Sequence, residues 1–190
     1  MRQALLLHPD SLSAAVTRIE VEMTRPQASR LVLAYVVTGR IGDLVVPRAA
    51  APTRTDELWR HTCFEAFVRR PPGGAYYEFN FAPSTQWAAY QFSGYRSGMR
   101  VGSEIGDPRV EVDSAPERYI LRASLELDEV LLAASGGERG RDAAWRLGLS
   151  AVIEEAGGRQ SYWALAHPQG KPDFHHSDCF TLEVPEPWRP

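Results

Sequence analysis

Residues 57–99 read ELWRHTCFEAFVRRPPGGAYYEFNFAPSTQWAAYQFSGYRSGM, and this stretch organises the rest of the chain. It holds two of the five tryptophans and five of the seven phenylalanines, and these aromatic residues alternate with polar ones over three short segments. Alternation with a period of two is typical of a β-strand that buries one face. Residues 71–74 and 83–85, rich in proline, glycine and serine, supply the turns between the segments. The stretch therefore predicts two β-hairpins in series.

The same alternation recurs on both sides of this stretch. Turn residues separate the segments, and the spacing is typical of an antiparallel all-β fold of about ten strands. An aspartate that can cap a helix, followed by a pair of glycines, predicts one short helix over residues 129–134. We expect an immunoglobulin-like β-sandwich that forms one domain over residues 1–190. The clearest further strands are expected at residues 16–23, 31–37, 118–127 and 145–153.

Composition narrows the class of protein. A chain of 190 residues with 44% hydrophobic residues can bury a full core. Its net charge of −3 argues against a nucleic-acid partner. The apolar run before His8 is too short for a signal peptide, and no later run could span a membrane, so we expect a cytoplasmic protein with no membrane partner. In that compartment Cys63 and Cys179 are expected to stay reduced.

Aromatic residues at strand ends and turns are the first candidates for a ligand site. Flat rings can stack on the C–H faces of sugars, while amide, carboxylate and guanidinium groups bond the hydroxyls. The alternative is that these rings only fill the core. The face of the two hairpins opposite the apolar one carries Cys63, Glu65, Glu78 and Asn80, and it is the other candidate for this site. The candidate rings are Trp59, Trp87, Tyr90, Tyr95 and Trp163.

A second hypothesis is a metal centre. The run HPQGKPDFHHSDC near the C-terminus is rich in residue types that bind zinc and other transition metals. The alternative is a turn whose side chains bond backbone groups, because adjacent histidines point to opposite faces of an extended chain. The residues that would form a metal site are His61, Cys63, His175, His176, Asp178 and Cys179.

Catalytic motifs are not found. Glu65 and Glu78 lie on neighbouring predicted strands and could form the carboxylate pair of a glycosidase, but sheet faces often carry glutamates. Cys63 and His61 share a strand face but lack an orienting third group. The sequence leaves enzymatic activity open and favours a non-catalytic protein.

Three blocks of the chain resemble the bacterial DOMON-like proteins, which are related in fold to the family 9 carbohydrate-binding modules. The blocks are LWRHTCFEAFV, YYEFNFAPSTQWAAYQFSGYRSGM and YWALAHPQGKPDFHHSDCF, and the resemblance spans residues 58–184. It implies an immunoglobulin-like sandwich whose relatives bind sugars or haem. For a sugar, it implies tryptophan platforms with polar partners, often beside calcium; haem would need a methionine–histidine pair from Met23 or Met99. The implied sugar-binding residues are Trp59, Trp87 or Trp163 as platforms, with Glu78, Asn80, Gln86 and Arg96 as partners.

The sequence therefore predicts a non-catalytic domain that binds a carbohydrate-like small molecule. A metal-binding protein or metal-dependent hydrolase is the alternative, with calcium or zinc as the cofactor, and a haem-binding domain is a further one. An exposed sheet edge or aromatic patch would also suit a homodimer.

Overall fold

The computed structural model describes the fold over most of the chain. The helix expected at residues 129–134 lies outside the described residues. Within them, no helix has the length and apolar character needed to span a bilayer. The described residues are 1–27, 30–69, 73–103, 105–126 and 145–183.

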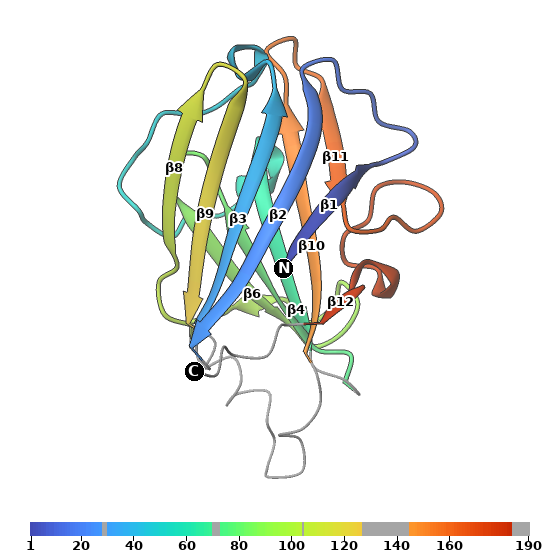
Figure 1. Ribbon diagram of the computed structural model, residues 1–190. Coiled ribbons are helices and arrows are strands. Elements are labelled where there is room, and N and C mark those ends of the chain that lie inside the picture. Colours follow the sequence, from blue (N-terminus) through green and yellow to red (C-terminus); the bar gives the residue numbers. More distant parts are fainter. Residues whose placement is uncertain (28–29, 70–72, 104, 127–144, 184–190) are drawn as a thin grey trace.

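The described residues form twelve β-strands and short 3₁₀ turns (Figure 1). The count exceeds the expected number, since β7 has only two residues and is too short for alternation to show in the sequence. The strands are β1 (Arg2–Leu7), β2 (Val16–Gln27), β3 (Arg30–Gly39), β4 (Cys63–Arg69), β5 (Tyr76–Phe81), β6 (Trp87–Phe92), β7 (Arg100–Val101), β8 (Arg109–Ala115), β9 (Arg118–Glu126), β10 (Arg146–Glu154), β11 (Gln160–Ala164) and β12 (Leu182–Glu183). The 3₁₀ turns are η1 (Ile41–Asp43), η2 (Leu58–Arg60) and η4 (Ser177–Cys179).

All strand pairs are antiparallel, and they form one curled sheet in the order β7-β6-β5-β4-β10-β11-β1-β2-β3-β9-β8, with β12 beside β10. Strand β1 makes the link, because its first four residues pair with β2 and its last two residues pair with β11. The half with β2, β3, β9 and β8 lies in front of the half with β4 and β6 (Figure 1). The all-β antiparallel prediction is confirmed. The strand pairing does not confirm the two separate sheets of a sandwich.

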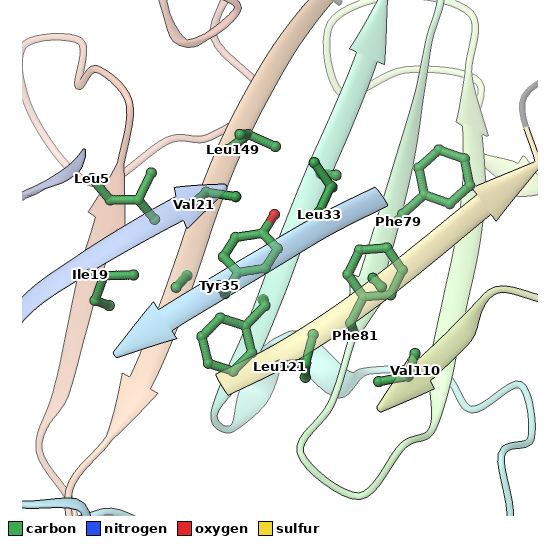
Figure 2. Close-up of a cluster of buried hydrophobic side chains, with 14 of the residues drawn as sticks. Leu5, Ile19, Val21, Leu33, Tyr35, Phe79, Phe81, Val110, Leu121 and Leu149 are labelled. Carbon is green, nitrogen blue, oxygen red and sulfur yellow. The ribbon is translucent and has the colours of Figure 1, made fainter. Parts of the chain in front are cut away.

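The main core fills the space between the two halves. The inward residues of each strand are the apolar members of the alternating pattern, and Leu33, Tyr35, Phe79, Phe81 and Leu121 are all fully buried there (Figure 2). The hydroxyl of Tyr35 donates a hydrogen bond of 2.7 Å to the backbone oxygen of Glu65, so it ties β3 to β4 across the core. Burial of these side chains is the main source of stability.

Strands β4 and β5 are also buried on their outer face. A second apolar cluster covers that face, and it includes Phe67, Tyr76 and Phe92 from the sheet. Phe174 and Phe180 cap the cluster from residues 166–180, which we call the cover segment. The polar residues on this face are therefore shut away from water, and this arrangement creates the candidate site.

Replacing Tyr35 with phenylalanine should lower the free energy of unfolding by about 1 kcal/mol, because it removes one buried hydrogen bond and leaves the packing in place. Urea denaturation of the wild type and Y35F measures the change. Y162F is the matched control, since that hydroxyl bonds a half-buried glutamine side chain at the edge of β11. Equal effects of Y35F and Y162F would contradict this role for Tyr35.

Candidate functional site

A row of polar side chains crosses the outer face of β10, β4 and β5. Glu65 lies opposite Ser150 on one neighbouring strand and opposite Asn80 on the other. Ser150 Oγ donates to Glu65 Oε2 at 3.1 Å, and Asn80 Nδ2 donates to Glu78 Oε1 at 2.7 Å. All four side chains are buried. The period of two places them together, because every second residue of each strand points to this face.

Both carboxyl groups of this row have raised pKa values. Burial raises the pKa of Glu65, and the nearby charge of Glu78 raises it further. Burial also raises the pKa of Glu78, against the hydrogen bond from Asn80 and the charge of Arg96. The pKa of Glu65, raised to about 8, keeps this carboxyl protonated near neutral pH. The pair can therefore act as both hydrogen-bond donor and acceptor.

His175 reaches this pair from the cover segment. Tyr76 donates its hydroxyl hydrogen to His175 Nδ1 at 2.7 Å, since burial raises the pKa of Tyr76 to about 12 and keeps the phenol protonated. The remaining ring nitrogen, Nε2, lies 3.8 Å from Glu78 Oε2. Burial and the charge of Arg96 lower the pKa of His175 to about 4, so the ring is neutral at physiological pH. We assign the proton to Nε2, where it faces Glu78.

An ion pair joins the cover segment to the loop after β6. Arg96 Nη2 and Nε donate to Asp173 Oδ1 at 2.7 and 3.2 Å, and Tyr95 donates to Asp173 Oδ2 at 2.5 Å. Burial alone would raise the pKa of Asp173, but the bonds from Tyr95 and Arg96 outweigh it and lower the pKa. Arg96 has a φ of 47°, in the left-handed region that non-glycine residues seldom adopt. Such strain concentrates at functional positions.

A cavity of about 620 Å³ opens beside this ion pair, and we call it the loop cavity. Its size suits a small organic ligand. Tyr95 at its rim is 58% exposed, and its ring meets that of His176 at nearly a right angle, with centroids 6.2 Å apart. The buried carboxyl pair lies behind the wall that Asp173 forms. Asp173 accepts from the backbone N–H of His175, and the ring of His175 lies next to Glu78. The residues lining the loop cavity are Tyr95, Arg96, Pro168, Gln169, Lys171, Pro172, Asp173, His176 and Asp178.

The predicted sugar-binding residues fall into separate places. Tyr95 and Arg96 line the loop cavity, while Glu65, Glu78 and Asn80 lie under the cover segment.

The tryptophans do not share a cleft. Trp87 and Trp163 are each 5% exposed and belong to the main core, because their positions on β6 and β11 face inward. This burial does not fit a stacking role for either ring. Trp59 is 48% exposed in η2, with the guanidinium of Arg60 over its ring. Two other candidates are held by bonds to nearby side chains: Tyr90 bonds Asp56, and Gln86 bonds Thr55 and Ser84.

The six predicted metal ligands are not gathered at one point. His61 is exposed and bonds Glu154, whereas Cys63 is buried and bonds the side chain of Asn80. Cys179 donates to two backbone oxygens, and His176 Nδ1 accepts from the backbone N–H of Asp178. Among the described residues, no group of three or more His, Cys, Asp or Glu side chains could hold a metal ion. The described part of the chain thus gives the metal hypothesis no support.

The haem hypothesis gains nothing from the described residues either. Met23 is fully buried in the main core, and Met99 is exposed.

Comparison with known proteins supports the fold only. No protein-family model matches the chain, and no curated protein is significantly similar to it. A candidate carbohydrate-binding protein from Bacteroides uniformis matches 95% of this chain and 84% of its own, with a TM-score of 0.64 and 14% identity. A family 9 carbohydrate-binding module from Caldicellulosiruptor kristjanssonii, solved with glucose, matches 87% of this chain and 76% of its own, with a TM-score of 0.45 and 12% identity.

The carboxyl pair predicts a pH-dependent effect of E65Q on stability. A raised pKa means that the folded state favours the protonated carboxyl, so this contribution is present below the usual pKa of a glutamate and is lost as the pH rises. Glutamine mimics the protonated form. The stability of E65Q relative to the wild type should therefore increase as the pH rises from about 5 to about 8, as measured by urea denaturation.

The exposed residue Glu22 offers the control, since E22Q should show no such gain. An E65Q effect that is the same at both pH values would contradict the buried pair.

Proposed function

We propose that the protein is a non-catalytic domain that binds a small carbohydrate-like ligand in the loop cavity. One observation carries the proposal: an exposed tyrosine ring lies next to a fixed Arg96–Asp173 ion pair at the mouth of the cavity. An open ring and paired donors and acceptors are the groups that sugar recognition needs.

The chemistry of the cavity suits hydroxyl groups, which both donate and accept. Arg96 and Lys171 can donate to ligand oxygens, Asp173 and Asp178 can accept from ligand hydroxyls, and Gln169 can do both. The ring of Tyr95 can stack on a C–H face of the ligand. Groups already fixed by the protein bind with less loss of conformational entropy.

The buried network behind the wall keeps the cavity in shape. The backbone N–H of Arg96 donates to the Tyr76 hydroxyl, which in turn donates to His175. The cover segment and the loop after β6 are therefore fixed to the same phenol. A ligand would meet a pre-formed surface, and selectivity would come from polar groups that need a partner.

Binding fits the geometry better than glycoside hydrolysis does. A glycosidase places two carboxyl groups on either side of the scissile bond. Here Glu65 and Glu78 are buried under the cover segment, and neither lines the loop cavity.

The fold likeness to the candidate carbohydrate-binding protein from Bacteroides uniformis is consistent with this function. The resemblance of three sequence blocks to DOMON-like proteins supports the same assignment, and we include membership of that group in the proposal. The curled sheet would then be a form of the immunoglobulin-like sandwich in which β1 links the two halves.

Calorimetric titration with mono- and oligosaccharides tests the proposal. At least one sugar should bind, and R96A should weaken that binding about tenfold or more, because it removes charge-assisted hydrogen bonds. Y95A should weaken it through loss of the stacking surface.

R109A is the control, since Arg109 is an exposed residue of edge strand β8 on the other half of the sheet. The proposal fails if no sugar in the panel binds. It also fails if R96A and Y95A bind as tightly as R109A.

A further inference from the structure

Two histidines meet at the start of the cover segment. His8 follows β1 and is 2% exposed, and His167 lies two residues into the cover segment. Their ring centroids are 4.8 Å apart, with the ring planes nearly perpendicular. Phe174, further along the segment, packs near His167.

Hydrogen bonds to the backbone define the tautomer of each ring. His8 Nδ1 accepts from the backbone N–H of Asp10 at 3.1 Å, so the proton of this ring is on Nε2. His167 Nε2 lies 2.8 Å from the carbonyl oxygen of Leu6 and must donate to it, so Nδ1 carries the lone pair. The pair thus presents one donor, His8 Nε2–H, and one acceptor, His167 Nδ1.

Both of these nitrogens are buried, and neither has a hydrogen-bond partner within the described structure. Buried polar atoms seldom go unpaired, because the loss of water is costly. The ring of His8 thus carries an unpaired donor, and the adjacent ring of His167 carries an unpaired acceptor. A small rotation, or one water molecule between the rings, would satisfy both.

We infer that His8 and His167 form an acid-sensitive latch that holds the start of the cover segment against β1, and that protonation of His167 opens it. A protonated His167 would bring an N–H group to face the N–H of His8. The acceptor would be lost and two donors would be opposed. A metal ion does not explain the pair. The lone pair on His8 Nδ1 already accepts from the backbone N–H of Asp10, whereas a metal-bound histidine gives one lone pair to the metal and donates from its other nitrogen.

The surroundings of His167 favour its neutral form. Burial lowers the pKa of His167 and the nearby His8 lowers it further, against the bond to the Leu6 carbonyl. The Cys179 thiol packs close by and donates to the carbonyl of Ala166. The packed elements carry the carboxylates of Asp10, on the turn after His8, and of Asp173, which Arg96 and Tyr95 already bind.

The direction of the pH effect follows from this lowered pKa. The folded state prefers neutral His167, so the latch contributes its full stability above the usual histidine pKa of 6.5 and loses it as the pH falls below that value. His175, in the same segment, has a pKa lowered to about 4 and would titrate only in stronger acid. The Glu65 carboxyl, with a pKa of about 8, also titrates between about pH 7.5 and about pH 5, so the comparison of the wild type with H167Q over this range isolates the latch.

The consequence for the ligand rests on the proposed function. The cover segment carries Asp173 and His175, so loosening its start would disturb the loop cavity in acid. The latch itself needs no ligand and can be tested without one.

Hydrogen–deuterium exchange of the free protein, read by mass spectrometry at both pH values and corrected for intrinsic exchange, tests the latch. Protection of residues 166–180 should fall several-fold at the lower pH, while β3 peptides keep theirs. H167Q should keep the protection and lose the pH step, because the glutamine amide donates to Leu6 and its oxygen accepts from His8. H8F removes the donor and should lower protection already at the higher pH.

A wild-type segment equally protected at both pH values would overturn the inference, and so would a pH step of full size in H167Q. Should H8F fail to fold, H167Q still decides between the outcomes. Neither result depends on whether a sugar binds, so failure of the latch and failure of the proposed function are distinguishable.

Discussion

The structure depends on the burial of β4 and β5 on both faces. Their inner faces pack into the main core, and the cover segment shields their outer face. Polar side chains on that outer face lose their water and must find partners within the protein. The links from Ser150 to Glu65, from Asn80 to Glu78 and from Tyr76 to His175 meet this need. The Tyr76 hydroxyl also bonds the backbone N–H of Arg96, so the link from Tyr76 to His175 fixes both loops that form the cavity.

Alternation of apolar and polar residues was enough to predict the strands and the two hairpins of residues 57–99. The alternation could not show whether an aromatic ring would pack in the main core or on the outer face of the sheet. Trp87 and Trp163 read as surplus aromatics, yet they fill the main core between the halves. The curled connection through β1 was also hidden, because a strand that changes partner midway keeps one continuous pattern.

The candidate site was predicted in part. Glu65, Glu78 and Asn80 share a face by the strand period, Tyr95 was a candidate as a surplus ring, and Arg96 was a polar partner implied by the resemblance. The ion pair of Arg96 with Asp173 joins residues 77 positions apart and depends on how the cover segment folds back. Ser150 could not be linked to Glu65 because pairing of distant strands leaves no local signal. The histidines and cysteines failed as a metal set because each has a separate partner.

The most direct test of the account is to map a bound sugar by the change in backbone amide NMR shifts on titration. The account predicts that the shifts concentrate in residues 93–99 and 166–178, which surround the loop cavity, with little change in β8 and β9. Shifts centred on Trp59 or on the β8 edge, with residues 93–99 and 166–178 unaffected, would contradict it.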